Sequence, residues 1–401
     1  MRSKGFEAVR TRARRNARRS AAGRLGLLAL LLALAAPALF YAVARAQEEM
    51  RPYAAKAQAK PQAPVQTKPA APEAIRSARV RPASVTKVNF KQLAELAKRA
   101  RVPPTSAPTL RAAPVPGRIK EMPAGKSVAP AAPPSSSAGG YVMGGPAQAL
   151  GQDDTGGPLA ASPSPSQSFL AQEDGPKVGS GTYIIPPDTN GAVGIDRVFT
   201  NTNSNYRIHD KATGAPLSTV STDTFWASSG GSNFFDPQIQ FDPYNRRWIL
   251  AITSNPSSAG SSVNVAVSQT SDPAGGYYVF RFPVGCAPGA ADCAPGGEWA
   301  DFPMLGFNKN WIAVGMNMFD LAGTEHNDDK MLVLDYPSAR AGAAVATVFG
   351  GLGIGFCNHP VTTYSATEGT LYTVRHIGSA DASYQTYAIT GTPAAPSLTA
   401  G

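Results

Sequence analysis

The chain has 401 residues, with 37 Lys and Arg, 27 Asp and Glu, 36 Pro and only 3 Cys. Its formal net charge of +10 is unevenly distributed: residues 1–46 carry ten basic and one acidic side chains, residues 47–174 sixteen and nine, and residues 175–401 eleven and seventeen. Because the C-terminal part is acidic, the high isoelectric point does not indicate a nucleic-acid-binding domain, and we expect no nucleic-acid partner. The 19 Pro among residues 47–174 also exclude a single globule of 401 residues.

The N-terminal segment has the pattern of an export signal. Residues 1–24 are basic and residues 25–44 are uncharged and rich in Leu and Ala, which predicts a cytoplasmic N-terminus followed by a hydrophobic helix that enters the membrane. The small residues before Gln47 predict cleavage between Ala46 and Gln47, so that residues 25–46 are a signal peptide. The alternative is a membrane anchor formed by residues 25–44. In either case we expect the rest of the chain outside the cytoplasm, secreted or periplasmic.

Residues 47–176 read as a spacer. Their islands of Pro, Ala and Ser predict an extended, disordered linker. One short basic helix is expected near residues 86–101, because apolar residues such as Phe90, Leu93 and Ala97 recur on one face among several Lys and Arg. We interpret it as a solvated linker helix, and the alternative is a helix that lies on anionic lipid or a cell-wall polymer.

From residue 177 to the end, the chain has short β-rich segments and no helical periodicity, which predicts an all-β domain. A two-strand unit recurs, in which a Pro and an apolar strand lead through a tight turn to a second strand. Its prolines are Pro187, Pro237, Pro303 and Pro360. A second hairpin follows each of the first three units, so a period of about 50 residues contains four strands. The pattern predicts a β-propeller of four-stranded blades, and the alternative is a β-sandwich of irregular hairpins. About four blades are present, and we expect the propeller to be incomplete at the C-terminus rather than to close as a four-bladed ring.

Several motifs resemble those of a family of uncharacterised exported bacterial β-propeller proteins. They are Asp188–Gly194, Phe241–Pro243 with Arg247 and Trp248, Val267–Pro273 and Asp301–Pro303, within about residues 181–364. The resemblance implies a propeller similar in outline to sialidases. The turn over residues 270–278 is similar to the Asp-box hairpin of that group, although it has one extra residue before Gly275 and carries Tyr278 where Trp is usual. The resemblance transfers no catalytic residue.

The three cysteines suit an oxidising compartment. Six residues separate Cys286 from Cys293, a spacing that predicts a small loop disulfide. A metal site is the poorer interpretation, because no His stands nearby. Cys357 is left either buried and free or without its partner.

The entry to each first strand of a blade is the candidate binding site. First strands of a propeller line its central channel, so Asp188, Asp236, Asp301 and either Asn358 or His359 should surround one mouth of the channel. Such a ring would hold a ligand or a cation, for which Ca²⁺ is the candidate. The alternative is that each Asp only caps the turn before its strand.

No catalytic constellation can be recognised, so we expect a binding or interaction module presented outside the cytoplasm, with a cell-surface or extracellular glycan or protein as partner and a membrane contact only through the N-terminal segment. One alternative is a sialidase-like glycoside hydrolase or lyase that uses the channel mouth, for which Asp236 and Asp301 are the pair to test. Another is a structural component of the cell surface or matrix.

Overall fold

The structure is a computed structural model, and it describes residues 75–99, 109–112, 165, 167–180, 182–352, 356–376 and 384–401. All of them belong to the compact unit Ala71–Gly401. The predicted basic segment, hydrophobic segment and cleavage site at Ala46 and Gln47 lie outside the described residues. Within the described part of the chain, no helix is both long enough and apolar enough to cross a membrane.

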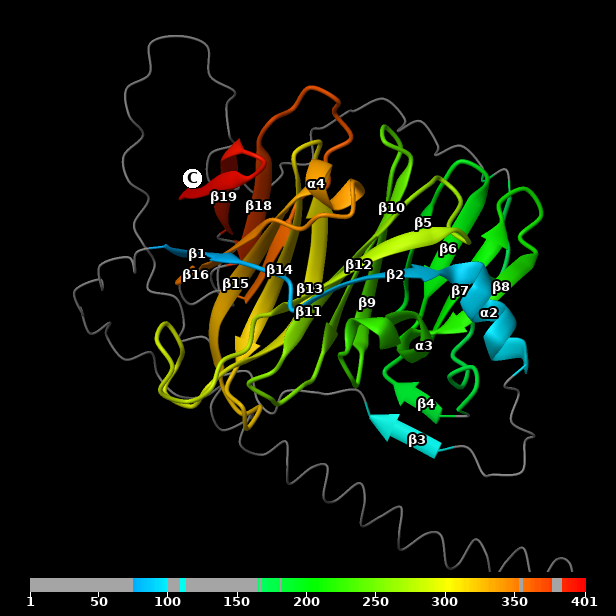
Figure 1. The fold of residues 1–401 in the computed structure, drawn as a ribbon, viewed down its shortest axis with the longest axis horizontal. Helices are drawn as coiled ribbons and strands as arrows, with labels where there is room; N and C mark the ends of the chain where they lie inside the picture. The colour runs from blue at the N-terminus through cyan, green and yellow to red at the C-terminus, as the bar shows by residue number, and fades with distance from the viewer. Residues whose placement is uncertain are drawn as a thin grey trace, which may run out of the picture. The chain divides into compact units, whose positions relative to one another are not determined.

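Four antiparallel sheets, each built from four consecutive strands, form the blades of a β-propeller (Figure 1). Blade I contains β5 (Asn190–Val193), β6 (Arg197–Asn201), β7 (Asn205–Asp210) and β8 (Pro216–Ser221). Blade II contains β9 (Phe235–Asp242), β10 (Arg247–Ser254), β11 (Ser262–Ser268) and β12 (Gly276–Pro283). Blade III contains β13 (Trp299–Phe307), β14 (Trp311–Phe319), β15 (His326–Asp335) and β16 (Ala346–Gly350). Blade IV contains β17 (Phe356–Pro360), β18 (Leu371–His376), β19 (Tyr384–Thr392) and β20 (Ala395–Ala400). The predicted all-β class and four-stranded blades are therefore confirmed.

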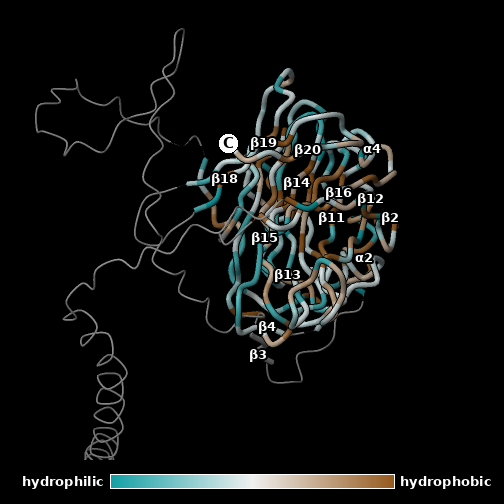
Figure 2. The backbone as a smooth tube through the Cα atoms, turned by 90° about the vertical axis from the view of Figure 1, so that its left-hand side faces the viewer, coloured by the Kyte–Doolittle hydropathy of each residue, from teal (hydrophilic) through white to brown (hydrophobic). Residues whose placement is uncertain are grey.

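The first strands of successive blades contact one another, β5 with β9, β9 with β13, and β13 with β17. The core lies between the blades, where hydrophobic segments gather around β11 and β14 (Figure 2). Gly315 in β14 allows the close approach of blade IV, because a Cβ there would overlap the carbonyl oxygen of Asn358. Apolar side chains on both faces of the middle strands thus fix the stacking of blades.

Short helices and one small sheet complete the described structure. They are α3 (Thr222–Trp226), the 3-10 turn η1 (Ala227–Ser229), α4 (Tyr336–Arg340), and the parallel pair of β3 (Thr109–Ala112) and β4 (Thr182–Ile185). Ser221 caps α3, accepting a hydrogen bond from the Thr224 amide at 3.1 Å. The helix buries Phe225 and Trp226, which pack edge to face.

The prediction of a disordered spacer is wrong for residues 75–99, which we call the strap. β1 (Arg76–Val80) extends blade III by pairing with β16, and β2 (Ser84–Asn89) extends blade II by pairing with β12 (Figure 1). α2 (Phe90–Arg99) follows, so the helix predicted near residues 86–101 begins four residues later. Residues 84–88 alternate between half-buried and exposed side chains and include Val85, Thr86 and Val88, which suits an edge strand. Asn89 then caps the helix, accepting from the Gln92 amide at 3.0 Å.

The buried face of α2 packs on protein. Phe90 and Ala94 are 0% and 2% exposed, and the Phe90 ring lies 5.5 Å from that of Phe199 in blade I. The apolar side of the helix is therefore occupied by the propeller, which contradicts both the solvated helix and the helix whose apolar side lies on lipid.

Candidate functional site at the channel mouth

One residue at the entry of each first strand has a left-handed backbone: Asp188 (φ 45°), Asp236 (φ 55°), Phe302 (φ 50°) and Cys357 (φ 61°). In blades II to IV a β-bulge accompanies it, because the pairing of the first two strands skips this residue and the next one. Bulges of this kind re-aim a side chain and often lie beside functional sites. A left-handed Phe is costly, since bulky residues rarely adopt this conformation.

This repeat corrects the register predicted from the prolines. Pro237 and Pro303 directly follow the left-handed residue, whereas Pro187 precedes it and Pro360 comes three residues after it. The prolines therefore do not occupy equivalent positions. As a result, Asp301 lies one residue before the left-handed position of blade III.

His359 was predicted at the mouth, but it lies two residues beyond Cys357. It pairs with Val374 directly after the bulge, as Gln238 pairs with Ala251 in blade II. Its Nδ1 lies 2.8 Å from the carbonyl oxygen of Pro360, and no described interaction joins it to the three aspartates. In blade IV, the thiol of Cys357 rather than the imidazole of His359 therefore belongs to the left-handed position at the mouth.

The structure brings the carboxyl groups of Asp188, Asp236 and Asp301 together from three adjacent blades. Asp236 is the central one, in hydrogen-bonding contact with both others. Burial, followed by the negative charge of Asp301 and the contact with Asp188, raises the pKa of Asp236 to about 9. Burial also raises the pKa of Asp301, to about 6, although the Phe302 amide and Asp236 partly offset it. The group therefore holds a proton at neutral pH, shared among coupled carboxyls.

Asn203, a fully buried residue between β6 and β7, fixes this arrangement. Its Oδ1 accepts from the Asp236 amide at 2.6 Å, and its Nδ2 donates to Asp188 Oδ2 at 2.6 Å. Asn317 plays the same part between blades III and IV, where its Oδ1 accepts from the Cys357 amide at 2.9 Å. Each carboxamide thus ties one blade to the left-handed residue of the following blade.

The three carboxyls differ in access to solvent. Asp188 is exposed, Asp236 is partly buried and Asp301 is 7% exposed. Oδ1 of Asp301 is buried and has no hydrogen-bond donor within the described structure. Phe302, which follows Asp301 in the chain, is 45% exposed.

Cys357 completes the mouth on the side of blade IV. It is a free thiol of intermediate burial, which both predicted outcomes allow, and burial is the main reason that its pKa rises to about 11. The negative charges of Asp329 and Asp301 add to the shift, and the contact with Asn317 opposes it. At neutral pH this residue is an uncharged thiol rather than a nucleophile.

Further along the first strands lies a cavity of about 390 Å³, lined by Asn190–Val193, Ile239–Phe241 and Tyr364. Gln240, one of the lining residues, donates from Nε2 to the Leu305 carbonyl at 3.0 Å, and its Oε1 accepts from the Thr362 hydroxyl at 2.8 Å. Gln240 therefore links three blades. The cavity has the size typical of small-ligand pockets.

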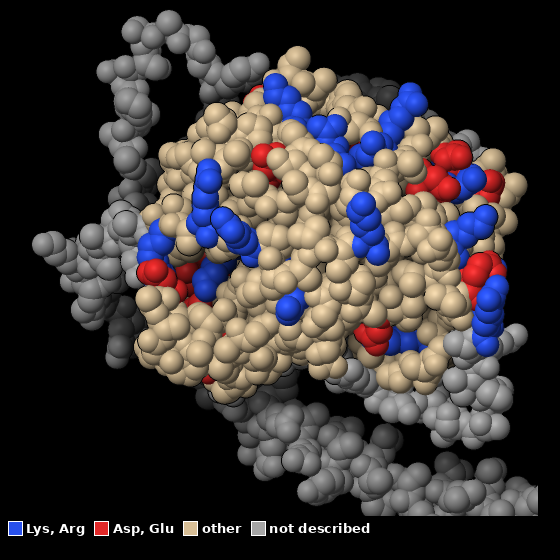
Figure 3. Space-filling view, in the orientation of Figure 1, with Lys and Arg blue, Asp and Glu red and all other residues tan. Residues whose placement is uncertain are grey.

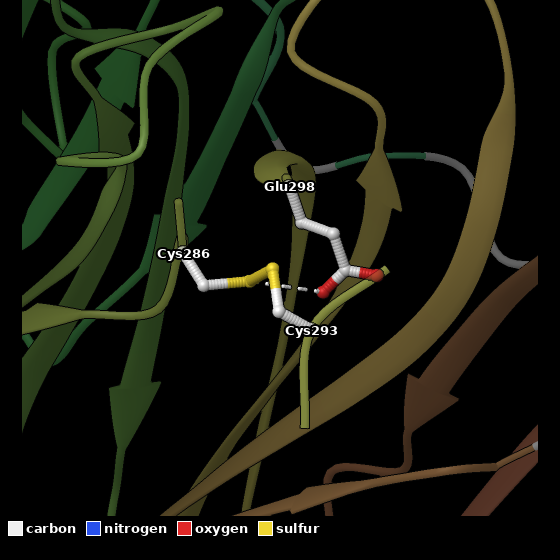
Figure 4. Close-up of side chains that lie close together, drawn as sticks. All are labelled: Cys286, Cys293 and Glu298. Atoms are coloured by element: carbon white, nitrogen blue, oxygen red, sulfur yellow. Dashed lines mark hydrogen bonds between the residues drawn. A yellow bond between two sulfur atoms is a disulfide. The ribbon is translucent and has the colours of Figure 1, made fainter. Parts of the chain in front are cut away.

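The predicted disulfide between Cys286 and Cys293 is confirmed (Figure 4). Together with Glu298 these cysteines are the one group in the described part of the chain whose three possible ligand atoms all lie within 4.8 Å of one another. The two sulfurs are bonded to each other and so are not thiolate ligands. The carboxylate of Glu298 instead accepts from Lys330 Nζ at 2.7 Å, as a buried ion pair. The three mouth aspartates are less tightly grouped than this set, which favours a proton-sharing row over a compact cation cage.

No family model matches the chain, and no curated protein matches it. Solved structures that share part of its outline include an exo-β-1,3-galactanase from Phanerochaete chrysosporium, at 12% identity and a TM-score of 0.31, over 58% of this chain and 53% of that one. An α-L-arabinanase from Penicillium chrysogenum matches at 13% identity and a TM-score of 0.32, over 54% and 67%. A subtype N11 neuraminidase-like protein from a flat-faced bat isolate matches at 9% identity and a TM-score of 0.29, over 53% and 58%. Thus this chain spans about half of the galactanase.

Proposed function

We propose that this chain is an exported β-propeller that cleaves a glycosidic bond of an extracellular glycan at its channel mouth. The proposal rests on one observation, the contact of three carboxyls from adjacent blades in which Asp236 keeps its proton at neutral pH. Carboxyl groups held in environments that push their pKa values apart are the usual basis of acid–base chemistry in an active site. Glycoside hydrolysis needs one protonated and one ionised carboxyl on either side of the scissile bond, about 5–9.5 Å apart, so Asp188 and Asp236, which contact each other in this structure, must separate when a glycan enters.

The roles follow from exposure. Asp236 is partly accessible and protonated, so it would donate its proton to the leaving oxygen of the sugar. Asp188 is exposed and held by Asn203, so it would act as the carboxylate that activates water or attacks the sugar. Asp301 is too deeply buried to reach a substrate, and we assign it as a positioning residue whose charge keeps Asp236 protonated. The accessible pair is therefore Asp188 and Asp236, not Asp236 and Asp301 as expected from the sequence.

The test is release of reducing ends from a panel of neutral and acidic polysaccharides by the purified chain. Asp188→Asn and Asp236→Asn should each abolish release, whereas Asp196→Asn, an exposed Asp in the turn between β5 and β6, should match the wild type. Equal activity of Asp236→Asn and the wild type would contradict the proposal. Glycan binding without any cleavage would instead support the binding module predicted from the sequence.

The role of Asp301 has its own readout in the pH profile of kcat/KM. With Asp236 as the acid, activity should decline on the alkaline side near pH 9, where Asp236 loses its proton. Asp301→Asn removes a negative charge beside Asp236, so the alkaline limb should move to lower pH. A variant that loses activity at every pH without moving this limb would show only structural damage.

Cation binding at the mouth is a second candidate, because Asp301 Oδ1 is buried without a donor in the described structure. If Ca²⁺ binds the three carboxyls, it must displace the proton of Asp236. Added Ca²⁺ would then raise the melting temperature of the wild type more strongly at pH 8 than at pH 6, and Asp236→Asn would abolish that rise.

Export remains part of the proposal. It is supported by the charge pattern around residues 25–44 and by the disulfide in the loop from Cys286 to Cys293. Mass spectrometry of material secreted by the native host should find a mature N-terminus at Gln47. An intact Met1 in that material would contradict cleavage.

A further inference from the structure

The strap carries a charge opposite to that of the domain on which it lies. Residues 75–99 contain seven basic side chains and only Glu95 as an acid, a net charge of +6, whereas residues 175–401 have a net charge of −6. All seven basic side chains are exposed: Arg76, Arg79, Arg81, Lys87, Lys91, Lys98 and Arg99. The strap is therefore a separate basic surface on an acidic propeller.

Attachment of the strap uses few of these charges. Backbone pairing holds β1 and β2, and the apolar side chains of Phe90 and Ala94 hold α2. Arg76 pairs with Asp292 at 3.3 Å, and Lys98 pairs with Glu95 of the same helix at 2.8 Å.

Three basic side chains of the strap are left for a partner. Arg81, Lys91 and Arg99 make no ion pair within 4 Å in the described part of the chain, although Lys91 and Arg99 act on Glu95 at longer range. Arg79 donates to the Ala394 carbonyl and Lys87 lies over the Tyr278 ring, so three of the seven basic side chains are free to meet an anion from solution.

The shape of this surface favours a chain over a plane. β1 and β2 lie on the outer edges of two neighbouring blades and α2 continues their line (Figure 1). The five residues of β1, the six of β2 and the ten of α2 together contribute roughly 50 Å of length. Figure 3, drawn from the same side, shows Lys and Arg side chains standing out along this face. A linear polymer can follow a strip of this length along its basic side chains.

The exposed apolar side chains of the strap also favour a polymer over a membrane. Only two large hydrophobic residues of the strap are exposed, Val85 at 49% and Leu96 at 58%. Two separated residues bury too little apolar area to insert into a membrane interface. Binding through the strap would be electrostatic and sensitive to salt.

We propose that the strap binds a linear anionic polysaccharide, one that carries carboxylate or sulfate groups along its length. β2 lies four strand positions from β9, roughly 19 Å outward from the strand that carries Asp236, so this site is separate from the channel mouth. It holds the polymer at the rim of the propeller, and it does so whether or not the mouth cleaves glycans. The proposal therefore stands or falls independently of catalysis.

The test measures binding of the full chain to polygalacturonate, with neutral dextran as the uncharged comparison. Arg81→Glu, Lys91→Glu and Arg99→Glu are combined, and the matched control combines Lys211→Glu, Arg246→Glu and Lys309→Glu, three exposed basic residues outside the strap. Both variants keep the basic residues of the N-terminal region, so their difference reports on the strap alone. Loss of three weak ion pairs should reduce affinity by roughly tenfold to a hundredfold in the first variant, with little change in the second.

Three results would overturn the proposal: equal weakening by both triple variants, binding that high salt does not reduce, or retention on vesicles of phosphatidylcholine with phosphatidylglycerol together with no retention on polygalacturonate. If charge reversal detaches the strap, seen as a lower melting temperature, the neutral triple variant with Gln at residues 81, 91 and 99 takes its place. That variant should also bind polygalacturonate more weakly than the wild type, but by a smaller factor than the charge-reversal variant.

Discussion

Replacing Asp236 by Asn should change how the stability of the protein depends on pH. The ordinary pKa of this carboxyl is 3.8 and its pKa in the folded protein is about 9, so between these values the native state keeps a proton that the unfolded chain has lost. Because the pKa of Asp236 is higher in the folded protein, this carboxyl contributes most to stability below pH 3.8. That contribution is lost as the pH rises toward about 9. The free energy of unfolding should therefore fall by about 1.4 kcal/mol per pH unit, which amounts to about 4 kcal/mol between pH 4 and pH 7.

The cleanest window is between about pH 7 and pH 8, because Asp301 and Asp328, whose pKa values are raised to about 6, have already lost their protons there. Urea unfolding followed by Trp fluorescence would give the free energy of unfolding at each pH. The wild type and Asp196→Asn should lose about 1.4 kcal/mol across this unit, whereas Asp236→Asn should stay level, since Asn reproduces the neutral carboxyl. Parallel profiles of the wild type and Asp236→Asn would refute the shared-proton arrangement at the mouth.

Further predictions concern the attachment of the strap and the loop beside blade III. Phe90→Ala should lower the free energy of unfolding by about 3–5 kcal/mol, because a fully buried ring between aromatic neighbours leaves a cavity; a loss below about 1 kcal/mol in a urea titration would mean that the strap does not dock as described. Serine at both Cys286 and Cys293 should cost about 2.5 kcal/mol from the loop-closure entropy of this short loop, measured by unfolding of the double variant against the oxidised wild type, and no difference would indicate that the bond does not form in solution. Lys330→Met should cost about 3–5 kcal/mol by leaving Glu298 buried and unpaired, and adding Glu298→Gln should recover part of that loss, whereas an additive double variant would argue against the ion pair.

Strand periodicity was sufficient to predict the blades, because period-two alternation and tight turns are local features. The repeat of apolar strand, turn and second strand is borne out in β9 with β10, β13 with β14, and β17 with β18. The disulfide was also predictable, since its loop is short and its cysteines have no nearby alternative partner.

Register was the harder problem. A β-bulge adds one unpaired residue to a strand, and in these strands apolar residues lie on both sides of it in the sequence, so the sequence does not reveal where Asp236 and Pro237, or Phe302 and Pro303, leave the ladder. Aligning the prolines therefore misplaced His359 and concealed the equivalence of Phe302 and Cys357 to the aspartates. The signal that could have helped is the cluster of Asn at 201, 203 and 205, because buried carboxamides commonly satisfy irregular backbone at strand ends.

The strap was missed for a different reason. Its strands are short and polar on one side, and they gain stability only by pairing with β12 and β16, whose sequences lie about 200 and 270 residues further along. Composition around the strap, rich in Pro and Ala, hides such non-local pairing. Only Phe90 and the alternation from Ser84 to Asn89 indicate that this part of the spacer docks on a folded domain.

The most direct test of the acid at the channel mouth is a titration of the Asp side-chain carboxyls by ¹³C NMR in the folded protein. We predict one resonance that is still protonated at pH 7, that titrates near pH 9, and that is absent from Asp236→Asn. If every Asp carboxyl of the folded protein is ionised at pH 7, no acid is available at the mouth and the proposed glycoside hydrolysis is contradicted.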